Sequence, residues 1–305
     1  MLYRRGVEGI GDYLSDREVQ RLYEDAGERR LRAFFKNKIL FHQHFARTGL
    51  RQARLLGYSL GTLFFGETDA QVVDSERQLA ALVRALIERS ATASVFIKPA
   101  TGAKGAECAR LDAPPTGERL ATLYRRLQAG SFVFEETIRQ HPRLAALCAD
   151  SVNTTRIITY LDEANLPHFL SAFLRVGVGG SVVDNASAGG LFVAVDLASG
   201  RLAPRAYRHL AAGGATYTHH PTTGVVFADF VLPAFDAARH LVQQAAQWLP
   251  YPLVGWDVAF AEDGPLLVEG NHETGFSAAE ISNGGSLRDP RFRAVFARLL
   301  AGRRG

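Results

Sequence analysis

The chain has 305 residues, of which 47% are hydrophobic and 22% charged, and its formal net charge is +4. This length is too great for a minimal module and suits one large domain or two closely packed ones, and the composition excludes disordered and fibrous proteins. The positive excess comes from scattered arginines. Small anionic molecules account for it as well as a nucleic acid would, so no nucleic-acid partner is predicted.

Cysteine content and hydrophobic segments bear on the location of the protein. Cys108 and Cys148 are too few for a disulfide framework or, alone, for a structural zinc site. The first six residues carry charge but no continuous apolar segment follows them, and no stretch approaches the ~20 apolar residues that a membrane span needs. We therefore expect a cytoplasmic protein without a membrane span.

The first predicted elements are helices. Between Asp16 and Thr48 the apolar residues recur at helical spacing. Gly27 is expected to separate two helices, and Gly49 to end the second. Residues 1–57 are therefore predicted to be a helical N-terminal segment.

Residues 58–137 are predicted to be a small lobe that alternates strands and helices. The expected elements are a strand at 58–65, a helix at 74–89, a strand at 94–98, a glycine-containing turn at 101–105, a further strand, a helix from Thr116 to about Gln128, and a strand at 132–134. This order is typical of an α+β lobe.

The rest of the chain, residues 138–305, is predicted to be a larger α+β lobe with long antiparallel strands. The expected strands are 155–161, 168–176, 191–196 and 256–260, and the expected helices are about 232–249 and 289–300.

Two segments near the C-terminus carry oxygen-bearing side chains. Residues 255–260 and 266–271 flank Glu262-Asp263-Gly264, which suits a three-residue hairpin loop closed by a left-handed glycine. Such a loop places Asp257 opposite Glu269, with Asn271 further along the same face. Two carboxylates and an amide are the hard oxygen ligands that Mg²⁺ prefers. The alternative is a solvent-exposed hairpin face, but the flanking residues are apolar.

A lysine and a glycine turn suggest phosphate binding. Lys98 ends a strand that is expected to be buried, and Gly102, Lys104 and Gly105 follow it. A lysine there can reach phosphate, and a flexible turn can fold its amides over it. A solvated lysine beside a common turn is the open alternative, since the sequence does not match the Walker pattern. Further on, the paired acids Glu135 and Glu136 end a strand where backbone groups and an acid can meet adenine.

Taken in order, these motifs resemble the ATP-grasp superfamily, most closely its sugar-transfer-associated branch, with kinship to the α-L-glutamate ligases. The matching segments are Lys36-Asn37-Lys38, Phe96-Ile97-Lys98-Pro99, Phe134-Glu135-Glu136-Thr137-Ile138, Val152-Asn153-Thr154-Thr155-Arg156, Arg175, Val183-Asp184-Asn185, Gly189-Gly190, Gly255-Trp256-Asp257 and Val268-Glu269-Gly270-Asn271. They cover most of residues 36–275.

The resemblance implies an α+β ATP-grasp fold, in which two lobes clasp ATP, preceded here by the helical segment 1–57. It implies the following roles: phosphate binding by Lys38, Lys98 and Lys104; adenine binding by Glu135, Glu136 and Ile138; binding of one or two Mg²⁺ ions by Asp257, Glu269 and Asn271; and an acceptor side near the γ-phosphate lined by Arg156, Arg175 and Asn185. Arginine suits the acceptor side because its planar fork holds a carboxylate or phosphate through two hydrogen bonds.

The implied activity is ATP-dependent carboxylate–amine ligation through an acyl phosphate, with release of ADP and phosphate. The substrates would be small molecules, such as an amino acid, amino sugar or peptide. A catalytically silent ATP-binding protein and an ATP-dependent phosphotransferase of polysaccharide biosynthesis stay open as alternatives, whereas a protein kinase would need H-R-D and D-F-G sequences that the chain lacks. Arg139-Gln140-His141-Pro142 lacks the acid that often holds the ribose, and residues 1–57 are expected to be helical rather than to form a full N-terminal α/β domain.

Overall fold

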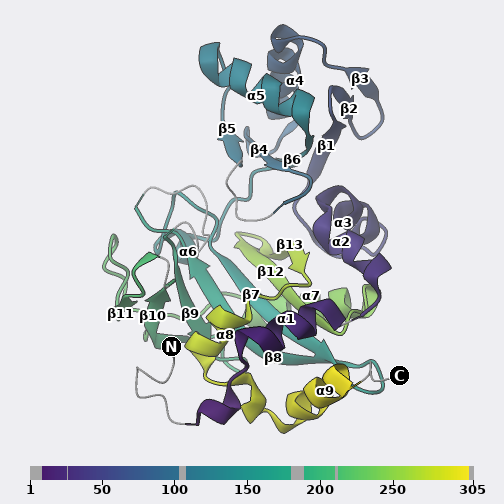
Figure 1. Cartoon of the computed structure of the whole chain (residues 1–305). Coiled ribbons are helices and arrows are strands. Elements are labelled where there is room, and N and C mark those ends of the chain that lie inside the picture. The colour runs from purple at the N-terminus through teal and green to yellow at the C-terminus, as the bar shows by residue number, and fades with distance from the viewer. Residues whose placement is uncertain (1–8, 26, 103–107, 180–188, 210–211, 302–305) are drawn as a thin grey trace. The chain divides into compact units, whose positions relative to one another are not determined.

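The computed structural model describes residues 9–25, 27–102, 108–179, 189–209 and 212–301. The chain forms two compact units, coloured by residue number in Figure 1. The large unit combines Met1–Phe35 with Gln140–Gly305, and the small unit is Lys36–Arg139. The lobe predicted over residues 58–137 lies within the small unit, which also contains helix α3 (Lys38–Phe45).

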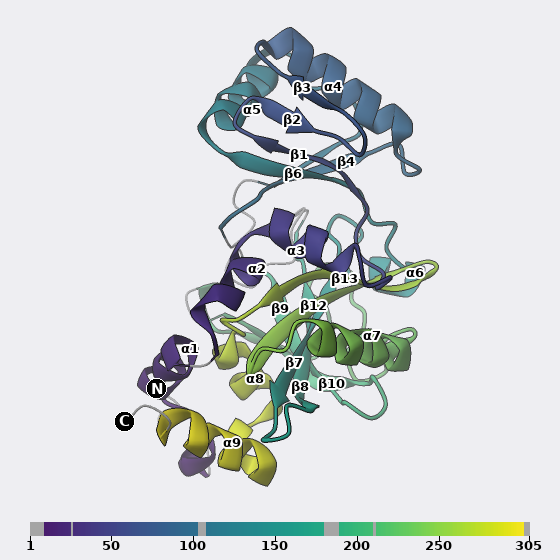
Figure 2. The ribbon, with the colours of Figure 1, turned by 90° about the vertical axis from the view of Figure 1, so that its right-hand side faces the viewer.

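The strands described in the small unit form one antiparallel sheet in the order β3-β2-β1-β6-β4-β5. Its strands are β1 (Leu55–Leu60), β2 (Leu63–Phe65), β3 (Ala70–Val72), β4 (Val95–Pro99), β5 (Ala109–Leu111) and β6 (Ser131–Glu136). Helices α4 (Glu76–Arg89) and α5 (Gly117–Ala129) pack against one face, over a core that includes Phe132 and Phe134. Figure 2 shows both helices on the same side of this sheet. Val133 points to the other face, where it packs with Ile39 of α3.

The prediction of one strand over residues 58–65 was wrong. The chain reverses there, because Gly61 adopts a left-handed φ of +59° and Leu60 pairs with Leu63. Strand β3 was missed as well. Its three residues are all exposed, so they show none of the apolar alternation that predicts a half-buried strand.

The strands described in the large unit form a second antiparallel sheet in the order β11-β10-β9-β8-β7-β12-β13. They are β7 (Thr154–Leu161), β8 (Pro167–Val176), β9 (Leu191–Val195), β10 (Leu202–Arg208), β11 (Thr216–Tyr217), β12 (Leu253–Ala261) and β13 (Gly264–Asn271). Helix α7 (Phe235–Trp248) packs on one side of the strands and α8 (Phe276–Asn283) on the other, as Figure 2 shows. The sequence did not predict β10, β11, α8 or the short helix α6 (Pro142–Ala145).

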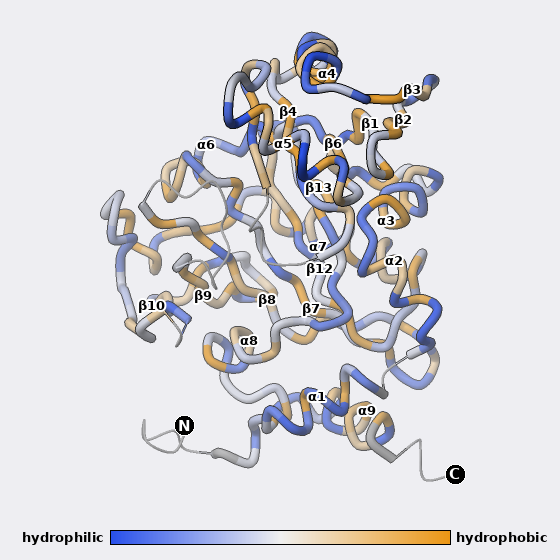
Figure 3. The backbone as a smooth tube through the Cα atoms, turned by 45° about the horizontal axis from the view of Figure 1, so that its top comes forward, coloured by the Kyte–Doolittle hydropathy of each residue, from blue (hydrophilic) through white to orange (hydrophobic). Residues whose placement is uncertain are grey.

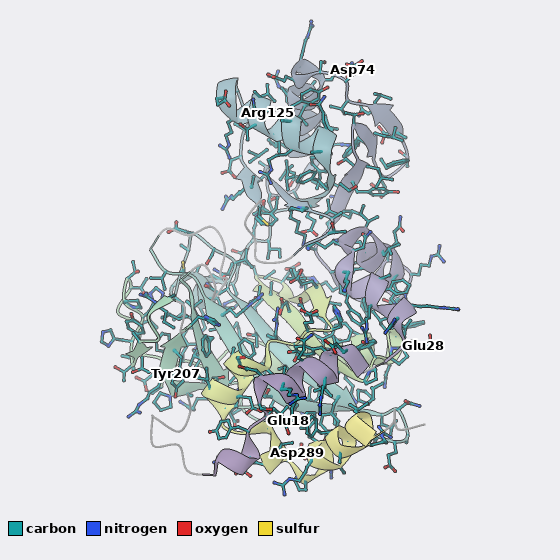
Figure 4. The ribbon with its side chains drawn as sticks, in the orientation of Figure 1. Glu18, Glu28, Asp74, Arg125, Tyr207 and Asp289 are labelled. Atoms are coloured by element: carbon teal, nitrogen blue, oxygen red, sulfur yellow. The ribbon has the colours of Figure 1, made fainter. Side chains whose placement is uncertain are left out.

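Helix α1 (Asp16–Asp25) belongs to the large unit and packs against α9 (Pro290–Ala301). Figure 3 shows that α1 is mainly hydrophilic, and its buried Leu22 joins the core formed with α8 and α9. Glu18, labelled in Figure 4, accepts a hydrogen bond from the Ser15 amide at 2.7 Å, while the Glu18 amide donates to the Ser15 hydroxyl. This reciprocal cap fixes the start of α1. The predicted break at Gly27 is present, with a φ of +69°.

The C-terminal hairpin pairs Asp257 with Glu269, as predicted, but its loop is shorter than the predicted three residues. The turn contains Glu262 and Asp263 alone, since Gly264 already pairs with Ala261. Val268 then forms a β-bulge, which shifts the register by one residue. The bulge therefore compensates for the shorter loop and restores the predicted pairing.

No helix in the described part of the chain is both long enough and apolar enough to cross a membrane.

Candidate functional site

A buried carboxylate lies at the centre of the charged cluster in the large unit. Asp257 of β12 is fully buried. Arg156 of β7 donates from Nε to Oδ1 and from Nη2 to Oδ2, both at 2.7 Å, and Arg175 of β8 donates from Nη2 to Oδ2 at 2.9 Å. The pairing of β7 with both neighbours places these side chains on one face of the sheet. Asp257 therefore fixes the position of two guanidinium groups.

The charge of Asp257 depends on these arginines. Burial alone would raise the pKa of its carboxyl, but the guanidinium groups of Arg156 and Arg175 outweigh burial and hold this pKa well below its usual range. The cluster therefore contains an ionised carboxylate and two guanidinium groups, and guanidinium groups can also bind an anionic ligand.

The other two predicted metal ligands lie beside Asp257. Asn271 Nδ2 is 3.3 Å from Asp257 Oδ2 and 3.4 Å from Glu269 Oε1. The amide nitrogen thus donates to both carboxylates. A 180° rotation of the amide would present an oxygen to the same point, because the two orientations differ only in which atom is nitrogen.

The side chains of Asp257, Glu269 and Asn271 are of the kind that binds Mg²⁺. Within the described residues no cluster of three or more His, Cys, Asp and Glu side chains could hold a metal, so an ion would rest on two carboxylates and the Asn271 amide. Such a sparse set matches Mg²⁺, which keeps several water or phosphate ligands. Both oxygens of Asp257 already accept from arginine, so an ion would share this carboxylate.

Helix α1 contributes a residue next to the cluster that the sequence did not single out. The Tyr23 hydroxyl accepts hydrogen bonds from the amides of Gly275 and Phe276, at 3.1 and 3.3 Å. Gly275 has a left-handed φ of +75°, and a Cβ there would lie 3.1 Å from Arg156 Nη1. Tyr23 therefore fixes the turn that packs against Arg156. No local pattern reveals this contact, because some 250 residues separate its partners.

A second buried carboxylate lies at the centre of the polar cluster in the small unit. Glu135 Oε1 of β6 is 2.7 Å from Lys98 Nζ of β4 and 2.6 Å from His42 Nε2 of α3. All three side chains are buried. Burial alone would raise the pKa of Glu135, but the Lys98 ammonium and the His42 hydrogen bond lower it to about 2. Glu135 therefore anchors the predicted phosphate lysine.

The other residues predicted to frame adenine lie at the end of β6. The Glu136 carboxylate accepts from the Ser90 hydroxyl at 3.2 Å and from the Thr92 amide at 3.1 Å. Its side chain thus holds the turn between α4 and β4. Ile138 is half-buried. With both acidic side chains engaged in this way, backbone groups are the contacts that this segment offers to a base.

Lys38 lies at the start of α3, beside the turn that follows β4. Its Nζ donates to the carbonyl of Gly102 at 3.1 Å, and its amide donates to the carbonyl of Ala100 at 2.8 Å. The Asn37 side chain caps the helix by accepting from the amides of Ile39 and Leu40. The small unit therefore holds Lys38 and Lys98 at the two ends of the same turn. Lys104 and Asn185, also predicted site residues, lie outside the described residues.

The model of the sugar-transfer associated ATP-grasp family matches residues 118–295. This match spans more than half of the sequence, and the chain belongs to that family. The family predicted from the order of the motifs is therefore confirmed. No curated protein matches the sequence.

Solved structures agree with this family. D-alanyl-alanine synthetase A from Vibrio cholerae aligns with a TM-score of 0.56 and 10% identity, over 91% of this chain and 67% of that chain. At such low identity the likeness shows the fold alone, and it confirms the predicted α+β ATP-grasp fold.

Two further structures are less similar. The D-alanine-D-alanine ligase from Coxiella burnetii aligns with a TM-score of 0.48 and 10% identity, over 91% of this chain and 62% of that one. The ATP-grasp ligase PsnB, complexed with a phosphomimetic variant of its minimal precursor, Mg and ADP, aligns with a TM-score of 0.48 and 14% identity, over 88% and 61%. Both scores are too low to carry an argument. The chain spans about two thirds of the synthetase and three fifths of these two proteins.

Proposed function

We propose that the chain is an ATP-dependent carboxylate–amine ligase that forms an acyl phosphate and releases ADP and phosphate. The observation that carries the proposal is the cluster of Asp257 with Arg156 and Arg175, two cations held on one buried carboxylate. Membership of an ATP-grasp family supports ATP as the phosphoryl donor.

In this proposal the small unit binds the phosphates of ATP. Lys98, held by Glu135, and Lys38, held at the neighbouring turn, supply positive charge to the phosphate oxygens. Lys104 would cover them, and the backbone near Ile138 would bind adenine. These assignments need an ammonium group to reach phosphate, which its flexible stem permits.

In the large unit Asp257, Glu269 and Asn271 would hold Mg²⁺, whose charge would offset that of the triphosphate. Arg156 and Arg175 would orient the acceptor carboxylate and the γ-phosphate, and Asn185 would also bind the acceptor. Their guanidinium groups stay charged at any pH of interest, and Asp257 limits their rotation. Charge that develops on phosphoryl oxygens therefore meets cations that are already in place.

The proposed reaction has two steps. A carboxylate oxygen of the substrate attacks the γ-phosphorus, and the bond from this phosphorus to the β-phosphate oxygen breaks, which gives an acyl phosphate and ADP. An amine then attacks the acyl carbon, phosphate leaves, and the amine nitrogen loses a proton to water. The carboxylate and amine substrates would be an amino acid, amino sugar or peptide. The cytoplasm would supply ATP and keep Cys108 and Cys148 reduced.

Product analysis tests this proposal. The full chain is incubated with ATP, Mg²⁺ and pools of carboxylates and amines, and the nucleotide products are separated. ADP and phosphate that appear only when both pools are present support the ligase. AMP with pyrophosphate would contradict the acyl-phosphate route.

The family description favours one second candidate, an ATP-dependent phosphotransferase that acts on a saccharide. It predicts ADP and a phosphorylated sugar in the absence of any amine. Tight ATP binding without turnover would instead indicate a silent nucleotide-binding protein.

A further inference from the structure

We propose that His42 is a positioning residue for the phosphate lysine Lys98 and acts on it through Glu135. The proposal rests on the proposed function in one respect, namely that Lys98 binds a phosphate of ATP. Neither the family match, which begins at residue 118, nor the sequence pattern assigns a role to His42.

The geometry makes Glu135 the shared partner of His42 and Lys98. One oxygen atom, Oε1, lies 2.6 Å from His42 Nε2 and 2.7 Å from Lys98 Nζ. The exposed fractions of the His42, Glu135 and Lys98 side chains are 3%, 4% and 6%. Water therefore cannot replace either contact, and a loss of one changes the other.

The direction of the hydrogen bond follows from the charge of Glu135. Because this carboxylate is ionised at neutral pH, it has no proton to donate, and His42 Nε2 must carry the hydrogen that joins them. Lys98 has three N–H donors. It can turn toward a phosphate oxygen only if Glu135 keeps another donor, since an uncompensated buried carboxylate is costly. His42 supplies that donor.

A histidine that served packing alone would be expected to satisfy both ring nitrogens. His42 Nδ1 is buried, and within the described residues it has no hydrogen-bond partner. The ring therefore tolerates an unpaired atom in order to present Nε2 to Glu135. This cost indicates that the contact of Nε2 with Glu135, rather than packing, explains why a histidine occupies position 42.

The placement of His42 on α3 supports the same conclusion. Lys38 and His42 are four residues apart on α3, so they lie on one face of the helix, one turn apart. Lys38 contacts the turn after β4, and His42 contacts the carboxylate that holds Lys98 of β4. One helix thus carries one phosphate lysine and supports the other.

Replacement of His42 tests the proposal in the full chain, with ATP binding measured by titration calorimetry in the presence of Mg²⁺. His42→Phe removes the donor, and Glu135 then holds Lys98 more tightly, so we expect ATP binding to weaken about tenfold or more. His42→Gln keeps an N–H donor and is expected to bind ATP within about threefold of the wild type. His42→Ala should regain affinity when imidazole is added, which covers the case in which the phenylalanine variant does not fold.

A matched control is His168→Phe. His168 also lies 2.7 Å from a carboxylate oxygen, that of Asp162, but in the large unit and partly exposed. Its ATP affinity should equal that of the wild type. Unchanged ATP affinity in His42→Phe, or equal losses in His42→Phe and His42→Gln without imidazole rescue of His42→Ala, would overturn the role of His42. A wild-type chain that binds no ATP would overturn the proposed function instead.

Discussion

Each of the two units contains a buried carboxylate that is contacted by basic side chains, but the side chains differ. In each, a buried carboxylate on a strand inside the sheet, Asp257 or Glu135, has a lowered pKa because N–H donors from neighbouring elements contact it. In the large unit the cations are two arginines, which bind through rigid forks. In the small unit a lysine and a histidine contact the carboxylate, each through one nitrogen atom. The difference suggests that the large unit fixes an orientation, whereas the small unit lets an ammonium group move.

Asp257→Asn should give the largest effect, because it leaves two guanidinium groups close together without an anion. We expect the free energy of unfolding to fall by about 4 kcal/mol, measured by urea denaturation at pH 7. Asp236→Asn is the matched control, since Asp236 pairs with Arg239 at 3.3 Å but is exposed. Its effect should be near zero. Equal effects of the two variants would show that the Asp257 cluster contributes no more than a surface ion pair.

Glu135→Gln should have a smaller effect on stability than Asp257→Asn. The substitution removes the anion beside Lys98, but the flexible lysine side chain can move its ammonium group toward solvent. We therefore expect the free energy of unfolding to fall by about 3 kcal/mol. The same denaturation experiment measures it. A loss equal to or greater than that of Asp257→Asn would contradict the view that the lysine cluster is the more adaptable one.

Stability should fall in acid because of both carboxylates. The pKa of Asp257 and that of Glu135 are lower in the folded chain than in the unfolded chain. Their contribution is thus complete above the unfolded pKa values, near 4, and decreases as the pH falls toward the folded values. Between pH 5 and pH 3 we expect the titration of these two groups to lower the free energy of unfolding by on the order of 2 kcal/mol. Urea denaturation across this range checks the slope, which should be flatter in Glu135→Gln; an unchanged slope would refute the contribution of Glu135.

Tyr23→Phe should have the smallest effect. It removes the acceptor for the amides of Gly275 and Phe276, and we expect a loss of about 1 kcal/mol. Tyr207→Phe is the control, because the Tyr207 hydroxyl, labelled in Figure 4, has no hydrogen-bond partner within the described part of the chain. Thermal unfolding compares the two variants. If they lose the same stability, α1 does not hold the turn beside Arg156.

The comparison also shows what the sequence could predict. The pairing of Asp257 with Glu269 was predictable, because both lie on strands joined by a short turn, even though the bulge at Val268 was not. The order of the motifs singles out Arg156 and Arg175, and the structure brings both to the Asp257 carboxylate. Their shared carboxylate was not predictable, because the sequence pattern indicates only a metal ligand at Asp257.

Contacts between distant segments were not predictable. His42 reaches Glu135 across 93 positions of the sequence, and its helical spacing gave no sign of a polar partner. Tyr23 likewise reaches Gly275 through tertiary packing. The hairpin at Gly61 was missed for a local reason, since one glycine between apolar residues fits a strand as well as a turn.

The most direct test of the central claim is Mg²⁺-dependent ATP binding by the double variant Asp257→Asn with Glu269→Gln. Titration calorimetry of the full chain, with and without Mg²⁺, compares it with the wild type, and circular dichroism checks that it is folded. We predict that the wild type binds ATP more tightly with Mg²⁺ and that the folded double variant loses this dependence. A folded double variant whose Mg²⁺-dependent ATP binding is intact would contradict the assignment of the metal ligands.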